Sequence, residues 1–425
     1  MNALLVGGGA REHALAWKIR QSPRVQKLYI APGNAGTLQH GINLSIQIND
    51  LQGITQAIKD YNIGLVIVGQ ELPLLLGLRE YITNQLNGIL IIGPGKKGAL
   101  LEGSKDFSKN FMLRNGIPTA KSKSFSADEL SEAKRYLSTH TLPLVLKADG
   151  LAAGKGVIIC HSLEKANEAI TDMLVKNRFG EAGNRVLIEE FLTGIEISIF
   201  ILTDGDNYVL LPEAKDYKRI GENDTGENTG GMGAVSPVPF ADASFMQTVD
   251  KTIIQPTLFG LKSESIPFCG FIYFGLINVN GKPYVLEYNV RLGDPEAEAI
   301  LPRIDSDLVD IFIACAKGEL KKTRIKISDD YATTVVLASE GYPNEYKTGH
   351  TITGLEIGTD SLLFHAATKV KDQNIITNGG RVMAITGKGS SLKEARIKVY
   401  ETISAISWKG MYFRNDIGLD LQNTE

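Results

Sequence analysis

The sequence predicts a multidomain chain of α/β and α+β construction, and three observations lead to this expectation. Its 425 residues are too many for one hydrophobic core. The first hundred residues alternate short apolar runs with helical stretches, which is typical of a parallel sheet. The last hundred combine strand-like runs with a helical repeat. We expect an N-terminal parallel α/β domain (1–103), a central α/β region (104–316) and a small C-terminal α+β domain (317–425).

The N-terminal domain is expected to supply binding loops at one edge of its sheet. Each predicted strand ends in glycine or proline, and parallel sheets bind ligands beyond the carboxyl ends of their strands. The loops "GGGAREH", "APGNAG" and "VGQELPLLLG" lie at such ends. The predicted strands are Leu4–Val6, Leu28–Ile30, Leu65–Val68 and Ile89–Ile92.

Helix and strand signals continue through the rest of the chain. Ser104 can cap a helix that carries Phe107 and Phe111 on one face, and Gly116 with Pro118 ends it. Alternating strands and helices follow to about residue 316. In the C-terminal domain, "TTVVLAS" and "RVMAITGKG" are predicted strands. The same domain is predicted to contain a helix, because apolar residues recur at helical spacing at Leu392, Ala395, Val399 and Ile403.

Composition excludes several classes of protein. The net charge is −3, the pI is near 6.2 and no basic block stands out, so we expect no nucleic-acid or anionic membrane surface. Cys160, Cys269 and Cys315 form no CxxC pair, which argues against a zinc site and a disulfide framework and favours thiols in a reducing compartment. No signal peptide or membrane-spanning apolar run is visible, so we expect a cytoplasmic protein.

"GGGAREH" follows a predicted strand and precedes a predicted helix. Small residues at such a place let backbone amides approach an anion. The dinucleotide fingerprint G-x-G-x-x-G fails because Glu12 stands at its last glycine, which disfavours a nicotinamide dehydrogenase. We favour binding of a phosphate or carboxylate, with Arg11 and His13 as polar partners. A simple tight turn is the alternative.

"KADGLAAGKGVII", residues 147–159, is a candidate phosphate loop. Gly150, Gly154 and Gly156 allow the backbone to approach a phosphate closely, and Lys147 and Lys155 can neutralise its charge. The pattern is not a Walker A motif, because G-x-x-x-x-G-K-[ST] is absent. A glycine hairpin with solvated lysines is the alternative.

Three glutamates interrupt the apolar strand pattern in "VLIEEFLTGIEISIF". Glu189, Glu190 and Glu196 are each placed where a carboxylate could accept hydrogen bonds from ribose hydroxyls. The backbone of residues 189–192 could bind an adenine edge in the same way. Glutamates that face solvent on an edge strand are the alternative.

"VLEYNVRLGDPEAE" carries the strongest local signal. Glu287 and Asn289 alternate with Tyr288 and so project from one face of a strand. Two oxygen ligands on one face suit Mg²⁺, which keeps waters and substrate phosphates at its other positions. Arg291 continues that face and could hold an anionic transferring group, and Asp294 lies in the following turn. A solvated polar strand face is the alternative.

The segment "KDYKRIGENDTGENTGGMGAVSP" is long, glycine-rich and mixed in charge. These properties are typical of a functional loop or lid. Its "NTGGMGA" part offers consecutive backbone amides as an anion-binding nest. A disordered connector is the alternative.

Taken in order, these motifs resemble one family over nearly the whole chain. "EGSK", "KADGLAAGKG", "IEEF", "NTGGMGA", "EYNVRLGDPE" and "TNGGRV" are similar to those of the glycinamide ribonucleotide synthetases, which belong to the ATP-grasp superfamily. The resemblance implies a pre-ATP-grasp N-terminal domain, an ATP-grasp core of two lobes and a small C-terminal domain. It also implies that one lobe, at about 120–190, is a mobile lid.

The resemblance assigns expected roles to individual residues. ATP and its phosphates would contact Lys105, Lys147, Gly154, Lys155, Gly156, Glu189, Phe191 and Glu196. Glu287 and Asn289 would hold the metal ion. The substrates would contact Gly9, Arg11, Asn34, Asp216, Arg291, Gly293 and Asp294. Among all these, the expected catalytic residues are Arg291, Lys147, Asp216 and Asp294.

The resemblance also implies a reaction. ATP phosphorylates the carboxylate of glycine, which gives glycyl phosphate and ADP. The amine of 5-phosphoribosylamine then displaces phosphate, and the product is glycinamide ribonucleotide, an intermediate of de novo purine biosynthesis. The expected partners are these small molecules with Mg²⁺ or Mn²⁺, and the expected state is a monomer or weak homodimer.

Three departures from the family pattern fall near the expected substrate pocket. Gln70 stands in "VGQE" where the family has proline, Tyr217 stands where it has histidine, and Glu298 stands where it has glutamine. They motivate two alternatives, namely another ATP-grasp carboxylate–amine ligase or a biotin-carboxylase-like enzyme. A non-catalytic nucleotide-binding protein is a third.

Overall fold

The N-terminal domain is built on a five-stranded parallel sheet. A computed structural model describes residues 1–150, 156–176, 184–356 and 360–422 of the chain. The strand order is β3-β2-β1-β4-β5 and all pairs are parallel; β1, β2, β4 and β5 are mainly apolar and buried as the sequence predicts, whereas the short edge strand β3 was not predicted and is partly exposed. Their bounds are Asn2–Gly7 (β1), Leu28–Pro32 (β2), Ile42–Asn43 (β3), Ile63–Val68 (β4) and Leu90–Ile92 (β5).

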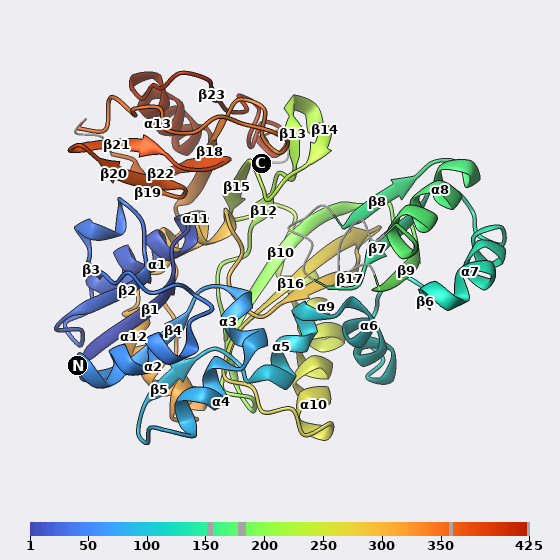
Figure 1. Ribbon diagram of the computed structural model, residues 1–425, viewed down its shortest axis with the longest axis horizontal. Helices are drawn as coiled ribbons and strands as arrows, with labels where there is room; N and C mark the ends of the chain where they lie inside the picture. Colours follow the sequence, from blue (N-terminus) through green and yellow to red (C-terminus); the bar gives the residue numbers. More distant parts are fainter. Residues whose placement is uncertain (151–155, 177–183, 357–359, 423–425) are drawn as a thin grey trace.

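Helices cover this sheet and connect its strands (Figure 1). A polar or glycine residue precedes each of these helices, and Asp50 caps α2 by accepting from the amide of Gly53. The bounds are Ala10–Arg20 (α1), Thr37–Gln39 (3₁₀ helix η1), Leu51–Asp60 (α2), Glu71–Leu76 (α3) and Leu78–Thr83 (α4). Lys96–Gly103 (α5) and Lys105–Arg114 (α6) lead into the central region.

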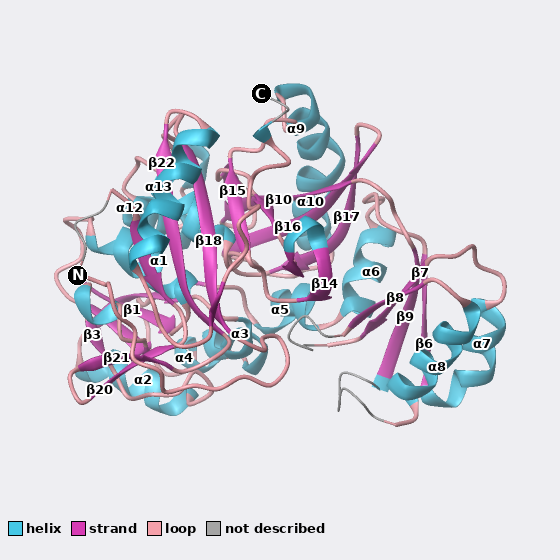
Figure 2. Ribbon diagram, turned by 90° about the horizontal axis from the view of Figure 1, so that it is seen from above, coloured by secondary structure: helices cyan, strands magenta, loops and turns pink. Residues whose placement is uncertain are grey.

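Residues 122–190 form a separate lobe at one end of the molecule (Figure 1, Figure 2). Its antiparallel sheet has the order β6-β9-β7-β8. Helices α7 and α8 pack on this sheet, and Phe125, Leu144 and Ile170 belong to the lobe's own hydrophobic core. The bounds are Ser122–Ser126 (β6), Ala127–Glu129 (η2), Leu130–Leu137 (α7), Leu144–Ala148 (β7), Val157–Cys160 (β8), Leu163–Leu174 (α8) and Arg185–Glu190 (β9).

The second lobe is a four-stranded antiparallel sheet of order β11-β10-β16-β17. Apolar residues of its strands share a core with α9 and α10 on one side, and others pack against α12. The strands are Ile195–Thr203 (β10), Tyr208–Leu210 (β11), Gly270–Val279 (β16) and Lys282–Asn289 (β17). The helices are Ala243–Val249 (α9), Asp250–Ile254 (the π-helical η5), Gln255–Ser263 (α10), Glu296–Ile300 (α11), Leu301–Arg303 (η6), Leu308–Ala316 (α12) and Leu320–Lys322 (η7).

The C-terminal sheet takes two of its six strands from the middle of the chain. Its order is β12-β15-β18-β22-β19, with β23 beside β18, and α13 packs on β18 and β22. Two hairpins, β13–β14 and β20–β21, lie outside it. The bounds are Lys215–Asp216 (β12), Arg219–Gly221 (β13), Glu222–Asp224 (η4), Thr225–Asn228 (β14), Gly233–Ser236 (β15), Tyr331–Ser339 (β18), Leu362–His365 (β19), Thr368–Lys371 (β20), Asn374–Thr377 (β21), Arg381–Gly389 (β22), Leu392–Ala405 (α13) and Met411–Tyr412 (β23).

The predicted fold class is confirmed. The parallel N-terminal sheet, the two lobes with antiparallel sheets and the C-terminal α+β unit are all present. Ser104 caps α6 as expected by accepting from the amide of Phe107 at 3.1 Å. The one feature that local sequence signals do not give is the pairing of β15 with β18, which joins the central region to the C-terminal domain.

Candidate active site

A buried carboxylate between two lysines lies where the two lobes meet. Glu189 ends β9 and pairs with Lys147 of β7 at 2.8 Å and with Lys109 of α6 at 3.1 Å. Burial alone would raise the pKa of Glu189, but the two ammonium groups hold it below its ordinary value. Burial lowers the pKa of Lys109 to about 8, although Glu189 opposes this. Each oxygen of the Glu189 carboxylate therefore faces one protein cation.

Lys105 is the second candidate phosphate ligand. It begins α6, and its Nζ donates to the carbonyl of Gly150 at 2.9 Å, so it lies beside the glycine loop. Burial lowers its pKa, while Glu287 opposes this. Gly156 is described and buried just before β8, whereas Gly154 and Lys155 lie outside the described residues. The Glu287 carboxylate favours the charged form of both Lys105 and Lys147, so these three side chains lie close to one another.

Three charged side chains form a chain of ion pairs between the second lobe and strand β12 of the C-terminal sheet. Lys218 contacts Glu196 of β10 and lies 3.3 Å from Asp216 of β12. Burial raises the pKa of Asp216, and the carboxylates of Asp216 and Glu196 hold the pKa of Lys218 well above its ordinary value despite its own burial. Phe191 is partly exposed in the segment that joins the lobes. Glu196 and Asp216 are thus coupled through a lysine that the sequence did not single out.

The predicted metal pair lies on one face of β17. Tyr288 between them points the other way, is buried and shares a hydrogen bond with Thr257 at 2.8 Å. The Asn289 amide satisfies its hydrogen bonds when its nitrogen faces the neighbouring acceptors. In that orientation the nitrogen donates to Glu102 Oε1 at 3.0 Å. This contact leaves the amide oxygen for a cation beside the Glu287 carboxylate. Oxygen donors of this kind fit Mg²⁺, which needs only one or two protein ligands when substrate phosphates supply others.

Arg291 follows β17 and turns toward the N-terminal domain. Its Nη2 lies 2.8 Å from Glu102 Oε1, and its Nε lies 3.5 Å from Glu71 Oε2. Burial alone would lower the pKa of Arg291, but Glu102 and Glu71 hold it above its ordinary value. Glu102 also accepts from the amide of Val290 at 2.8 Å. One carboxylate therefore orients both Arg291 and the amide of Asn289.

Arg11 approaches the same place from α1. Its Nε pairs with Glu12 Oε1 at 2.7 Å, and its Nη1 donates to the carbonyl of Leu292 at 3.0 Å. Glu12 Oε2 accepts from the amide of Gly9 at 2.6 Å. Glu12 therefore binds both the glycine loop at Gly9 and the Arg11 side chain. It is also the residue that breaks the dinucleotide-binding fingerprint. Arg11 and Arg291 converge next to Leu292, since both donate to its carbonyl.

Asn34 closes the loop after β2. Its Nδ2 donates to the carbonyls of Gly8 at 3.0 Å and His365 at 2.7 Å, and its Oδ1 accepts from the amide of Gly36. His13 Nδ1 accepts from the amide of His365 at 2.7 Å. Asn34 and His13 therefore join the glycine loop to the C-terminal domain, and the Asn34 side chain is already engaged by protein groups.

The "GDPE" turn is held by an arginine from β22. Arg381 Nη1 lies 3.0 Å from Asp294 Oδ1 and donates to the carbonyls of Asp294 and Gly230 at 2.7 and 2.8 Å. Asp294 faces the Gly9 loop, because a Cβ on Gly9 would lie 3.4 Å from its Oδ2. Gly293 permits the close approach of Glu296, whose carboxylate would lie 2.3 Å from a Cβ there. Burial and the nearby Asp216 raise the pKa of Glu296 to about 7.

The three departures from the family pattern occupy different surroundings. Gln70 lies near the glycine loop and donates to Glu12 Oε2 at 3.4 Å. Tyr217 does not face the pocket, because its hydroxyl donates to Asp420 at 2.6 Å in the C-terminal core. Glu298 is buried, its oxygens lack a hydrogen-bond partner among the described residues, and burial with Asp294 holds its pKa well above its ordinary value. A protonated Glu298 has nearly the shape of the expected glutamine.

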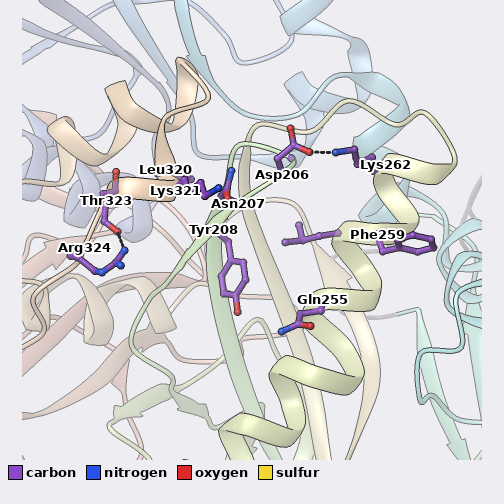
Figure 3. Close-up of a pocket in the computed structure, with 12 residues that line it drawn as sticks. Asp206, Asn207, Tyr208, Gln255, Phe259, Lys262, Leu320, Lys321, Thr323 and Arg324 are labelled. Atoms are coloured by element: carbon purple, nitrogen blue, oxygen red, sulfur yellow. Dashed lines mark hydrogen bonds and ion pairs between the residues drawn. The ribbon is translucent and has the colours of Figure 1, made fainter.

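A hollow of about 460 Å³ lies elsewhere on the second lobe (Figure 3). It is bordered by the hairpin between β10 and β11, by α10 and by the segment around η7, and Lys262 pairs there with Asp206. Its described lining contains none of the predicted site residues. The candidate site is therefore defined by its charged side chains and not by this hollow.

The structure thus brings most of the predicted residues together around β17 and the turn after it. Sequence reasoning missed several side chains that position them. Glu12 lay within "GGGAREH", Glu102 began "EGSK" and Arg381 lay within "TNGGRV", so each could have been chosen from a motif already recognised. The residues missed are Glu12, Glu71, Glu102, Lys109, Lys218 and Arg381.

Three family models together match most of the chain. They are the N domain (residues 1–102), the ATP-grasp (A) domain (103–297) and the C domain (332–420) of phosphoribosylglycinamide synthetase. Among the described residues, no helix has the length and apolar character that crossing a membrane requires.

Curated relatives and solved structures agree with these matches. The chain is 45% identical over 424 residues to phosphoribosylamine–glycine ligase of Vibrio vulnificus, covering 98% of each, and 44% identical over 423 residues to that of Haemophilus influenzae, again covering 98% of each. The crystal structure of the Thermotoga maritima ligase superposes with a TM-score of 0.87 at 35% identity, covering 98% of this chain and 100% of that one.

More distant structures share the fold alone. The biotin carboxylase domain of Hydrogenobacter thermophilus 2-oxoglutarate carboxylase, solved with MgADP and bicarbonate, superposes with a TM-score of 0.72 at 17% identity, covering 100% of this chain and 93% of that one. The ligases named above thus combine full-length coverage with 35–45% sequence identity, whereas this carboxylase domain shares the fold at 17% identity. The chain belongs to the phosphoribosylglycinamide synthetase family and is an ATP-grasp ligase that forms carbon–nitrogen bonds.

Proposed function

We propose that this chain joins glycine to 5-phosphoribosylamine at the expense of ATP, through glycyl phosphate. One observation carries the assignment of residues. β17 places Glu287 and Asn289 on one face and continues at once into Arg291 and the turn at Asp294, so the nucleotide and acceptor halves of the site share one strand and turn. Relatives named for this activity match over the full length of the chain.

The nucleotide half of the site uses two buried lysines. Lys147 is fixed by Glu189 and by the carbonyl of Leu286 at 3.2 Å, and Lys105 lies beside the start of the glycine loop. Both ammonium groups can neutralise phosphate oxygens without a large loss of side-chain freedom. The backbone of Glu189 and the partly exposed Phe191 are then the contacts for adenine, and Glu196 is the contact for ribose.

Glu287 and Asn289 would hold Mg²⁺, and Mn²⁺ would fit the same oxygen donors. When bound, the ion neutralises phosphate charge and orients the terminal phosphoryl group. Glu102 supports this pair by holding the amide of Asn289. Among the described residues, no group of three or more histidine, cysteine or acidic side chains is placed to bind a metal ion. The arrangement we propose is two protein ligands together with oxygens of the substrate phosphates.

The acceptor half binds the two smaller substrates. Gly9, Arg11 and the Asn34 loop would hold phosphoribosylamine, while Asp216, Gly293 and Asp294 would hold glycine. Arg291 would steady the acyl phosphate as its charge develops. The chemistry then needs no protein nucleophile, since alignment of the reactants can supply up to about 7–11 kcal/mol. Exclusion of water by the lid at 120–190 protects the mixed anhydride.

The wider setting is part of the same proposal. We place the reaction in the cytoplasm, as a monomer or weak homodimer, with no nucleic-acid or membrane partner. The domain bounds 1–103, 104–316 and 317–425 describe the order along the chain, although strands β12 and β15 complete the C-terminal sheet.

Oxygen tracing tests the proposal directly. The reaction is run with glycine labelled with ¹⁸O in its carboxylate, and the released orthophosphate is examined by mass spectrometry. One labelled oxygen must pass to phosphate, because the carboxylate attacks the terminal phosphoryl group. ADP release should also require both glycine and phosphoribosylamine. Unlabelled phosphate, or ADP release with another acid–amine pair alone, would contradict the assignment.

A further inference from the structure

Two thiols lie against each other in a place that the proposed reaction does not use. Cys269 immediately precedes β16, and Cys315 lies near the end of α12, 46 residues later in the sequence. Their sulfur atoms are 3.7 Å apart. Cys269 Sγ also donates to the carbonyl of Ile91 at 3.4 Å, and Cys315 Sγ donates to that of Thr203 at 3.1 Å. The pair therefore lies where the N-terminal sheet meets the second lobe.

Cys269 is accessible and activated, whereas Cys315 is not. Cys269 is partly exposed and lines a hollow of about 150 Å³ with Arg79 and Phe268, but Cys315 is buried. The contact with the Cys315 sulfur and the nearby Arg79 guanidinium lower the pKa of Cys269 to about 7, against the effect of burial. Arg79 is fixed there by its bonds to the carbonyls of Gly93 and Ile91, both at 2.7 Å. A partly exposed thiol with a lowered pKa beside a second thiol is the arrangement of redox-active cysteines.

We propose that Cys269 and Cys315 form a peroxide-sensitive dithiol, in which Cys269 is the attacking and Cys315 the resolving sulfur. The Cys269 thiolate attacks one oxygen of hydrogen peroxide, the O–O bond breaks, and sulfenic acid forms with loss of water after proton transfer. The Cys315 sulfur then attacks the sulfenic sulfur, the S–O bond breaks, and a second water leaves as the disulfide forms. Peroxide is reduced by two electrons and the two thiols are oxidised.

The cross-link would enclose the segment that carries the reaction. Residues 270–314 contain β16, β17, Arg291 and the "GDPE" turn. A disulfide restricts an unfolded chain more than a folded one, so the oxidised protein should unfold at a higher temperature than the reduced protein. The same cross-link would tie α12 to the start of β16 at the edge of the N-terminal sheet.

Thiol counting and peptide mapping test the proposal on the full-length protein. After treatment with hydrogen peroxide and denaturation, Ellman's reagent should detect one of the three cysteines, and digestion should give a peptide pair joined between Cys269 and Cys315 that dithiothreitol separates. Cys160→Ser is the matched control, because Cys160 lies in the lid lobe, and it should keep the cross-link. Cys315→Ser should instead give a dimedone adduct on Cys269, and it should show no oxidation-dependent rise in melting temperature.

Three results would overturn the proposal. They are detection of all three thiols after peroxide treatment, a cross-link that involves Cys160, and a dimedone adduct of Cys315→Ser that is no stronger at Cys269 than at Cys160. Because both cysteine variants are compared with the wild type in melting temperature before oxidation, misfolding of a variant is recognised separately. A wild-type protein that forms no joined peptide decides against the proposal without any variant.

Discussion

Single residues in the candidate site are held by opposite charges more than by apolar packing. Glu102 contacts Arg291 at 2.8 Å, and Glu12 contacts Arg11 at 2.7 Å. Both arginines donate to the carbonyl of Leu292. Because these carboxylates are buried, each fixes the direction of its arginine before any substrate arrives. Pre-oriented cations of this kind stabilise developing negative charge at little reorganisation cost.

Replacing Glu287 with glutamine should remove the charged metal ligand. We expect kcat to fall by roughly 100-fold or more, as for other removed electrostatic contacts at a reacting phosphoryl or acyl group. Folding should change little, because Tyr288 and not Glu287 packs in the core. Steady-state kinetics over a Mg²⁺ titration measure this. Glu132→Gln on the exposed face of α7 is the control, and full turnover of Glu287→Gln at ordinary Mg²⁺ would remove Glu287 from the metal pair.

Replacing Arg11 with glutamine should affect one substrate selectively. The KM for phosphoribosylamine should rise roughly 10-fold or more, since a charge-assisted hydrogen bond contributes about 1.5–3 kcal/mol. The KM for ATP should change much less, because Lys105 and Lys147 are untouched. Arg20→Gln at the other end of α1 is the matched control. Equal changes in both KM values would place Arg11 outside the acceptor pocket.

At the scale of single residues, the sequence indicates which side chains could be ligands more readily than which side chains support them. Glu287, Asn289 and Arg291 follow from alternation along one strand, which depends on neighbouring residues alone. Glu102 contacts Arg291 from a helix 189 positions earlier in the chain, so no local pattern could give it. The contact of Glu189 with adenosine stays a prediction, while the ion pairs of its carboxylate with two lysines were not predicted.

Loops that contain glycine let neighbouring secondary-structure elements of this protein approach one another closely. The loop before β15 lies against the "GDPE" turn, because a Cβ on Gly231 would lie 2.4 Å from Pro295 Cδ. Gly231 also has a φ of +116°, which side chains rarely adopt. Its neighbour Gly230 accepts from Arg381 at 2.8 Å. The sequence predicted "NTGGMGA" as a functional loop, but its contact with the turn is set by tertiary structure.

Replacing Gly231 with alanine should therefore separate two elements of the site. We expect kcat to fall and the free energy of unfolding to fall by more than about 1 kcal/mol, because both the backbone conformation and the Pro295 ring oppose a Cβ. Gly318→Ala is the matched control, since Gly318 has a φ of +73° but nothing within 4 Å of the added Cβ. Chemical denaturation and kinetics measure the two effects. Equal behaviour of both variants would show that the contact with Pro295 is unimportant.

The junction between the Asn34 loop and β19 should be sensitive to acid. Burial lowers the pKa of His13, His40 and His365, the last to about 4 from 6.5. The unfolded chain thus binds more protons in this interval, so stability present above pH 6.5 is lost as the pH falls toward 4. His365 alone accounts for roughly 3 kcal/mol of this loss.

Urea unfolding of His365→Gln between pH 4 and 7 measures this dependence. The variant should show a shallower loss of stability than the wild type in the interval from 6.5 to about 4. His161→Gln is the control, since His161 is exposed in the lid lobe and should leave the slope unchanged. Parallel curves for wild type and His365→Gln would assign the acid sensitivity to other groups.

Across the whole molecule, the C-terminal domain completes the site instead of standing apart from it. Arg381 joins the strand β22 to Asp294 and Gly230, and His365 joins β19 to Asn34 and His13. The fold class and the strand positions could be predicted, because apolar runs and punctuation are local. The six-stranded sheet could not, because β15 and β18 pair across nearly a hundred residues.

Replacing Arg381 with glutamine should weaken these long-range connections. We expect a loss of about 2 kcal/mol in the free energy of unfolding, as for a hydrogen-bonded charge. We also expect a fall in kcat, because the turn at Asp294 loses its anchor. Differential scanning calorimetry and kinetics on the same preparation measure both. Arg324→Gln on the exposed surface is the control, and normal turnover of Arg381→Gln would show that the turn holds its place without it.

The shared sheet also constrains how the protein is made. A ribosome emits β12 and β15 long before β18, so β15 can pair with β12 but lacks its partner on the other side until the final quarter of the chain emerges. The lid lobe, with its own core, can mature during translation, whereas the catalytic turn and its arginine must await release. Stalled translation products that lack β18 would expose an unpaired edge of β15, and such an edge invites aggregation.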